Sequence, residues 1–289
     1  MKKWLLTGLA MLAIVHSGLA LEEKEEKKMR EFRFGEWTLT ALQDASSTMR
    51  RELFPALPEK EFVRLAGGRQ APASVNVFLL KRGDGQTVLV DAGYGSGRGS
   101  MEKELKRAGI APEKISAVLL THMHGDHIGG LIDSEGKAFF PAAKLYVSAP
   151  EQEYWQNNAP ASAGGDRART VLKAYDGRVI TFRFGEEPLP GIRALDASGH
   201  TPGHTVYESD SFLILGDLLH AAAVQFARPE ISATYDMDPE KAVSARRRFY
   251  DLSERSAKPV AGMHLPFPGV GKITRSRTVG YVYTPLMNP

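Results

Sequence analysis

The sequence of 289 residues predicts a single domain of the α/β (α+β) class, in which mixed β-sheets are covered by helices. Two observations carry this prediction. Strand-like and helix-like segments alternate along the chain, which is typical of parallel strands connected by helices. Turn sequences between neighbouring apolar segments also predict hairpins, which pair strands antiparallel. The sequence shows no internal repeat and no interdomain linker.

The first predicted strands are marked by alternating apolar side chains. Residues 37–41 and 75–79 each place apolar side chains on one face of an extended segment. Gly83-Asp84-Gly85 predicts a hairpin turn that leads into a further strand at 88–90.

A helix and two buried strands are expected next. Ser100 is expected to cap a helix over 101–108. The continuous apolar run at 115–120 predicts a strand buried on both faces, and 145–147 predicts another.

The second half of the chain repeats this alternation. Pro150 is expected to open a short helix that ends near Trp155. Strands are expected at 205–207 and 212–215, on either side of a turn. Asp238-Pro239 predicts the start of a helix that runs to about Arg255, and the chain then returns as a strand at 259–263.

Composition and charge exclude several classes of function. Hydrophobic residues make up 43% and charged residues 25%, as in ordinary globular proteins. The net charge of +3 gives no electrostatic basis for binding nucleic acid or anionic lipid. The chain has no cysteine, which excludes disulfides, thiolate nucleophiles and Cys-ligated zinc.

Residues 1–20 have the organisation of a signal peptide. Lys2 and Lys3 precede an apolar run, and small residues end the segment at Ala20. We expect cleavage after Ala20, a periplasmic or secreted protein, and no membrane association after cleavage. An uncleaved anchor is the alternative, although the run is short for a membrane span. Residues 21–31 are then expected to form a charged leader, and 32–289 the folded domain.

A cluster of histidines follows the apolar run at 115–120. His122, His124, Asp126 and His127 lie within six residues. Imidazole and carboxylate are natural ligands for an ion such as zinc. In a tight turn, the first two side chains can face one ion and the last two can face a second. The alternative is a solvated loop whose histidines arise by chance.

Three later polar residues stand at the ends or turns of apolar strands. They are His200, Asp217 and His264. Folds with mixed sheets place their sites at such strand ends. Each has an ordinary interpretation when viewed alone, as a turn histidine, a strand-terminal aspartate or a surface histidine. Together with the histidine cluster they predict a metal centre.

These motifs resemble the metallo-β-lactamase superfamily. The pattern consists of His-x-His-x-Asp-His, Gly-His-Thr-Pro-Gly-His, Gly-Asp and a late histidine, and it covers essentially all of the mature chain. The resemblance implies an αββα sandwich of two mixed sheets flanked by helices, with two divalent ions at one edge, most naturally Zn²⁺. It assigns the first ion to His122, His124 and His200, the second to Asp126, His127 and His264, and the bridging position to Asp217.

Two further residues receive roles from this resemblance. Asp91 matches a strand-end aspartate that orients a ligand histidine, with a turn-forming aspartate as the alternative. His204 lies in the same motif as His200, but it is the first histidine that serves as the ligand in this family. We therefore expect His204 to support the site without binding metal.

Three segments resemble a narrower group, the exported methyl parathion hydrolases, which include phosphotriesterases, arylesterases and lactonases. They are 34–42, 222–226 and 264–269. By this resemblance an aromatic pocket wall is expected, with core packing as the alternative. A histidine three residues after Asp217 is expected to face the substrate, with a buried, hydrogen-bonded histidine as the alternative. These pocket candidates are Trp155, Phe226 and Tyr235 for the aromatic wall, and His220 for the substrate.

The expected function is hydrolysis of a lactone, an aryl ester or a phosphotriester. Two bound cations can deprotonate a bridging water, and the hydroxide then attacks a carbonyl carbon or phosphorus. Asp126 is expected to take up a proton. A thioesterase resembling glyoxalase II and a β-lactamase are the alternative enzymes, and a metal-binding module with the same fold is the non-enzyme alternative. The expected partner is a small-molecule substrate without nucleic acid, and both a monomer and a homodimer fit the sequence.

Overall fold

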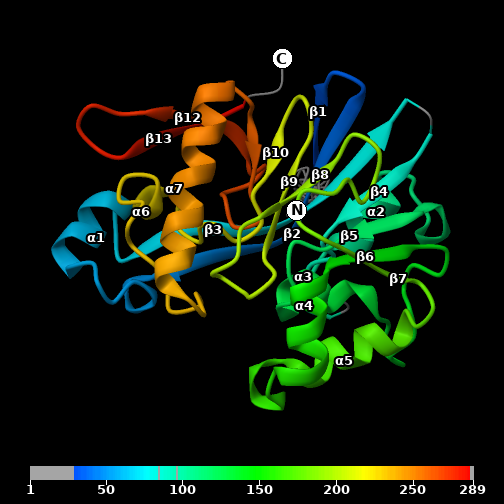
Figure 1. The fold of residues 1–289 in the computed structure, drawn as a ribbon. Helices are drawn as coiled ribbons and strands as arrows, with labels where there is room; N and C mark the ends of the chain where they lie inside the picture. Colours follow the sequence, from blue (N-terminus) through cyan, green and yellow to red (C-terminus); the bar gives the residue numbers. More distant parts are fainter. Residues whose placement is uncertain (1–28, 84, 96, 287–289) are drawn as a thin grey trace, which may run out of the picture.

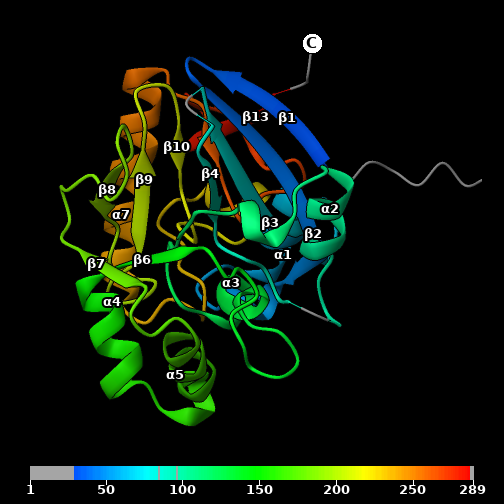
Figure 2. The same ribbon diagram turned by 90° about the vertical axis from the view of Figure 1, so that its right-hand side faces the viewer.

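Two β-sheets lie face to face between two layers of helices (Figure 1). The computed structural model describes residues 29–83, 85–95 and 97–286. Figure 2 shows α2 and α7 on opposite sides of this sandwich. The arrangement confirms the predicted fold class. Among the described residues, no helix is both long and apolar enough to cross a membrane.

The first sheet has seven strands in the order β1-β2-β3-β4-β5-β6-β7. Strands β1 to β4 pair antiparallel, and β4 to β7 pair parallel. The bounds are β1 Met29–Phe34, β2 Trp37–Arg50, β3 Gln70–Arg82, β4 Thr87–Val90, β5 Ala117–Leu119, β6 Lys144–Ser148 and β7 Val179–Phe182.

The second sheet has six strands in the order β13-β12-β11-β10-β9-β8. Only β10 and β11 pair parallel within it. The bounds are β8 Arg193–Asp196, β9 Thr205–Glu208, β10 Leu213–Ile214, β11 Val260–Ala261, β12 Val270–Arg275 and β13 Tyr281–Pro285.

Helices cover the outer faces of both sheets (Figure 1). The α-helices are α1 Glu59–Ala66, α2 Met101–Arg107, α3 Gly125–Ile128, α4 Ala149–Glu153, α5 Gly165–Ala174, α6 Ala222–Gln225 and α7 Pro239–Ser256. Short 3-10 helices lie at Arg51–Leu53, Pro112–Lys114, Gly129–Leu131 and Ala161–Ala163, and a π-helical turn lies at Tyr154–Asn158.

The apolar core has layers because strand side chains alternate between the two faces. Leu39 of β2 points between the sheets, toward the second sheet, whereas Leu42 belongs to the core under α2. Phe249 of α7 packs on the outer face of the second sheet. Each fully buried side chain of this size contributes about 1.5–3 kcal/mol of transfer free energy, so the layers fix the sheets against each other.

Most of the predicted strands and helices are present, with changes at their ends. The strand predicted at 37–41 extends to Arg50 as β2. The helix predicted after Ser100 is α2, but the Ser100 side chain makes no capping hydrogen bond. Instead, the carboxylate of Asp44 accepts the Met101 N–H at 2.8 Å. Asp44 stands at a bulge between β2 and β3, which redirects its side chain.

The N-terminal boundary of the domain lies earlier than the sequence predicted. Residues 29–31, which were expected in the charged leader, pair with residues 40–42 of β2. They are in a strand because their backbone groups complete the edge of the first sheet. The predicted signal peptide at 1–20, and residues 21–28 of the leader, lie outside the described residues.

Candidate metal centre

The seven predicted ligand residues lie at one edge of the sandwich and come from both sheets. His122 and its neighbours follow β5, while Asp91 follows the parallel strand β4. In the second sheet, Asp217 follows β10 and His264 follows the parallel strand β11. His200 precedes β9, which is antiparallel to β10. Strand direction therefore brings these segments to one edge.

Three imidazoles form the first group of potential ligands. The Nδ1 atom of His124 is 3.0 Å from Nε2 of His122 and 2.9 Å from Nε2 of His200. Their nitrogen atoms all lie within 4.8 Å of one another. Three nitrogen donors so close together can serve as ligands of a single cation.

Asp126, His127 and His264 form a second group of potential ligands. Nε2 of His264 is 3.5 Å from Oδ2 of Asp126, and Nε2 of His127 is 3.9 Å from its Oδ1. This group also offers three donor atoms within 4.8 Å.

The carboxylate of Asp217 stands between the two groups. Its Oδ2 is 3.4 Å from Nε2 of His200 and 3.0 Å from Nε2 of His264. Its Oδ1 is 3.3 Å from Nε2 of His127. One buried carboxylate thus faces a histidine of the first group and two histidines of the second.

Unpaired buried atoms show that the residues fit metal ions. Among the described residues, Nε2 of His127 and Oδ1 of Asp217 are buried without a hydrogen bond. The two atoms face each other at 3.3 Å without the geometry of a hydrogen bond. Because imidazole nitrogen and carboxylate oxygen are ligands that zinc accepts, cations in this position would satisfy both atoms.

Burial and charge set the protonation of the site. Burial lowers the pKa of His122 and of His124 well below the ordinary value, which favours the neutral imidazole that binds cations. Burial opposes charge on His127 as well, but Asp217 and Asp91 raise its pKa well above the ordinary value. Burial likewise opposes charge on Asp217, yet His127 and His264 hold its pKa well below the usual range.

Asp91 lies where the sequence placed it, against a ligand candidate. Its Oδ2 is 2.7 Å from Nδ1 of His127. The same carboxylate accepts the backbone N–H of Thr121 at 2.8 Å and its hydroxyl at 2.7 Å. Asp91 itself has a φ of 57°, in the left-handed region that few non-glycine residues adopt. The arrangement directs Nε2 of His127 into the centre.

Two other histidines are oriented by partners that the sequence analysis did not identify. Nδ1 of His264 is 2.9 Å from the Ser74 carbonyl oxygen, and Nδ1 of His200 is 3.0 Å from Oδ1 of Asp236. In each case the partner oxygen accepts a hydrogen bond from Nδ1–H, which leaves the Nε2 lone pair directed toward the centre. No local motif marks Asp236, which lies 36 residues from His200 in sequence.

His204 is buried beside the centre with both ring nitrogens already engaged. Nε2 accepts the backbone N–H of Asp217 at 2.9 Å, and Nδ1 is 3.1 Å from the Ala197 carbonyl oxygen. Burial lowers the pKa of His204 to about 3, so the ring is neutral at ordinary pH. The geometry therefore agrees with the expectation that His204 supports the site without binding metal.

Glu151 connects the segment after β5 with the segment before β9, and no pattern in the sequence indicated it. Its buried carboxylate accepts the backbone N–H groups of Met123 and Gly203. It also accepts the Trp155 indole N–H and the Thr201 hydroxyl. The only local signal was a helix start at Pro150, which says nothing about these long-range contacts.

A cavity of about 470 Å³ opens over the centre. His220 and Tyr235 line it, as the sequence analysis expected for both. Tyr235 is 47% exposed, while His220 is buried. The complete lining is Ser47, Thr48, Met49, Tyr94, Arg98, His124, Gly125, Asp126, Arg167, His200, Asp217, His220, Tyr235 and His264.

Trp155 and Phe226 do not line this cavity, contrary to the expectation for the aromatic wall. Trp155 is fully buried, because its indole N–H is bound to Glu151 and its ring packs edge-on against His124. Phe226 belongs to the core under α7, where it stacks between Tyr250 and Tyr283 at centroid distances of 4.8 and 5.2 Å.

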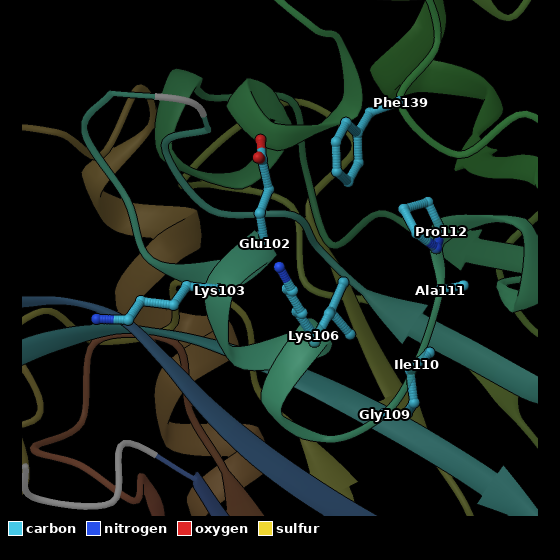
Figure 3. A pocket seen from close by; sticks show the side chains of 9 residues that line it. Glu102, Lys103, Lys106, Gly109, Ile110, Ala111, Pro112 and Phe139 are labelled. Carbon is cyan, nitrogen blue, oxygen red and sulfur yellow. The ribbon is translucent and has the colours of Figure 1, made fainter.

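A second cavity lies away from the metal centre, beside α2 (Figure 3). Its volume is about 700 Å³, and Leu105, Ile110, Pro112 and Phe139 contribute apolar walls. Its lining contains no residue of the candidate metal centre, which makes the smaller cavity the one relevant to the chemistry of the site.

Comparisons with known structures agree with this geometry. The chain is similar to the hydrolase AbOPH of the beta lactamase superfamily, with a TM-score of 0.83 and 30% identity over 92% of this chain and 100% of that one. It shares its fold with AidC, a dizinc quorum-quenching lactonase, with a TM-score of 0.83 and 24% identity over 90% of this chain and 98% of that one.

Curated relatives cover a smaller region. A hydroxyacylglutathione hydrolase of Xanthomonas campestris pv. campestris is 34% identical over 143 residues, which are 50% of this chain and 46% of that protein. The chain thus spans about half the length of the curated relatives it matches. The model of the metallo-beta-lactamase superfamily matches residues 71–264, from β3 to the last predicted ligand. With the two sheets and the converging histidines, this match shows that the chain belongs to the metallo-beta-lactamase superfamily.

Proposed function

We propose that this protein is a dinuclear metal-dependent hydrolase that cleaves lactones, aryl esters or phosphotriesters, as in the methyl parathion hydrolase group. One observation carries the proposal: the buried carboxylate of Asp217 lies between two groups of three potential ligands, and it forms further such groups with His122 and His127 and with His200 and His220. A mononuclear site would not need this second group. The solved relative at 30% identity is itself a hydrolase, which supports the reaction class.

The ligand roles follow from the two groups. His122, His124 and His200 would hold the first cation, Asp126, His127 and His264 the second, and Asp217 would contact both. When bound, the cations supply Lewis acidity toward the substrate oxygen and activate water. The chain's own contribution is then to orient the imidazoles and to hold the released proton. Asp126 lines the cavity and is the carboxylate we assign to that proton.

His220 is the residue we propose to contact the substrate. Among the described residues, its two ring nitrogens are buried and make no hydrogen bond. Nε2 lies 3.4 Å from Oδ2 of Asp217, at the wall of the cavity. An imidazole N–H there can donate to the single oxyanion that forms when an ester or lactone is attacked. A phosphotriester needs more room for its three substituents, so we propose that esters and lactones are preferred.

A substrate panel on zinc-loaded protein tests the proposal. It compares lactones, aryl esters, dialkyl aryl phosphotriesters, a glutathione thioester and a cephalosporin by kcat/KM. We expect the lactone or aryl ester to give the highest value. A panel without turnover on fully loaded protein would contradict the hydrolase, and preferred turnover of the phosphotriester would contradict the order of substrates.

His220→Leu tests the role of the imidazole. The variant should lower kcat/KM for esters or lactones and raise it for phosphotriesters. The ratio of these two kcat/KM values is the quantity to compare, because differences in metal loading cancel in it. Tyr235→Leu is the matched control, because it enlarges the same wall without removing an imidazole. An unchanged ratio in the His220 variant would show that this residue does not select the substrate.

Thioester hydrolysis is the second candidate. It is favoured by the 34% identity to a hydroxyacylglutathione hydrolase over half of the chain. The region of similarity leaves out much of both proteins, so the glutathione thioester in the panel decides between the two substrates. Preferred turnover of that thioester would replace the lactone proposal.

We also propose that the protein is exported and is either periplasmic or secreted. The basic start, the apolar run and the small residues that end at Ala20 support this. N-terminal sequencing of the exported protein should begin near Leu21. An intact Met1 on the mature protein would contradict the proposal.

A further inference from the structure

Arg246 of α7 lies outside the cavity, yet it contacts segments that carry predicted ligands. Its guanidinium is fully buried, which is costly for a charged group unless its donors are satisfied. Nε donates to the carbonyl of Leu218, the residue directly after Asp217. Nη1 donates to the carbonyls of Pro229 and Ile231 at 3.0 Å each.

The remaining nitrogen of Arg246 reaches the partner of His200. Nη2 is 3.3 Å from Oδ2 of Asp236, and Oδ1 of Asp236 is 3.0 Å from Nδ1 of His200. The Asp236 Oδ2 atom also accepts the Ala233 N–H at 3.0 Å. Arg246 is thus connected to two ligand candidates. It reaches His200 through the carboxylate of Asp236, and Asp217 through the carbonyl of the next residue, Leu218.

We propose that Asp236 and Arg246 are positioning residues that set the metal affinity of the ion site to which His200 belongs. The proposal rests on the proposed metal site. Asp236 accepts a hydrogen bond from Nδ1–H of His200 and so directs the Nε2 lone pair to the metal. Arg246 holds the second oxygen of Asp236, which fixes the rotation of that carboxylate. It also fixes the backbone that follows Asp217.

The chemistry of the two side chains explains why a guanidinium is needed. Both carboxylate oxygens of Asp236 are engaged: Oδ1 by His200, and Oδ2 by the Ala233 N–H and by Arg246. The fork of Arg246 reaches four separate acceptors, whereas the single ammonium of a lysine is a compact point charge and cannot span them.

The test measures Zn²⁺ affinity by competition with a chelator, and the absorption spectrum after Co²⁺ substitution. Asp236→Asn and Arg246→Lys should each weaken one of the two sites by about 10–100-fold, as loss of an outer-shell partner does. In Asp236→Asn the other site should keep its affinity, because Asp236 reaches the centre through His200. The Co²⁺ bands of the weakened site should shift, because the His200 ring is no longer fixed.

Arg178→Lys is the matched control. Arg178 also donates hydrogen bonds to backbone carbonyls, those of Phe140, Pro141 and Ala143. None of these residues adjoins a ligand candidate. Its substitution should lower thermal stability and leave both Zn²⁺ affinities unchanged. An equal loss of affinity in this control would show that a general loss of stability explains the effect, and the proposal would be overturned.

Folded Asp236→Asn and Arg246→Lys variants with the affinity and Co²⁺ spectrum of the wild type would also overturn it. If Arg246→Lys does not fold, Asp236→Asn decides alone, because it keeps the shape of the side chain. These readouts do not depend on turnover. Wild-type protein that binds two ions but cleaves no substrate would therefore contradict the proposed function and leave this inference standing.

Discussion

The two halves of the candidate metal centre are built in different ways. In the half nearer the first sheet, four ligand candidates come from the single turn 122–127, and Asp91 at the end of the neighbouring strand orients one of them. In the other half, His200, Asp217 and His264 come from three separate segments of the second sheet. The first half is therefore encoded locally, while the second exists only once the second sheet has formed.

Asp217→Ala is expected to have the largest effect, because it removes the carboxylate that stands between the two groups of ligand candidates. The carboxylate lies within 3.8 Å of Nε2 of His122 and closer still to those of His127 and His264. Elemental analysis of the folded variant should find neither ion retained after gentle purification. Full metal content with wild-type activity would mean that the two halves are joined by something else.

Asp91→Asn should have the next largest effect, and it should be confined to the ion held by the group that contains His127. The amide cannot serve as an anionic partner for Nδ1 of His127, so the ion held by that ring should bind about 10–100-fold more weakly. Chelator competition measures both sites in one titration. An equal loss at the two sites would show that Asp91 does not act through His127 alone.

Glu151→Gln tests whether the carboxylate that connects the two halves stabilises the folded protein. The carboxylate accepts four hydrogen bonds from segments at both sides of the centre, and the amide would turn an N–H₂ group toward some of these donors. We expect a loss of about 1–3 kcal/mol in the free energy of unfolding. Glu153→Gln, at an exposed position of the same helix, is the control and should leave the stability unchanged. Equal stability of the two variants would refute the role of Glu151.

His204→Ala should have the smallest effect on metal content. Both nitrogens of this ring are engaged by backbone groups, so the variant should keep two ions. Its free energy of unfolding should fall by about 1–3 kcal/mol, because the buried N–H of Asp217 loses its acceptor. Denaturant unfolding and elemental analysis measure the two quantities. Loss of an ion from the folded variant would show that His204 is itself a ligand.

The same contrast explains what could be predicted from the sequence. The histidine cluster, the strand ends and the Asp238-Pro239 helix start are local patterns, and the structure has each of them in its expected place. Asp236, Glu151 and the helix contact of Asp44 depend on segments far apart in the chain, so no spacing marks them.

Aromatic residues were predicted least well. Trp155 and Phe226 were expected at the pocket from the resemblance, but an aromatic ring serves a core and a pocket wall equally well. Which of the two it faces depends on the rotation of a short helical segment. The structure turns both rings into the core, whereas Tyr235, in a loop, reaches the cavity.

Metal titration of the stripped protein tests the central claim most directly. Protein freed of metal by a chelator is titrated with Zn²⁺ while binding and lactone or aryl-ester hydrolysis are followed together. The account predicts that binding saturates at two ions per chain and that activity returns only as these sites fill. Reproducible saturation at one ion or none, or hydrolysis that survives complete removal of metal, would contradict it.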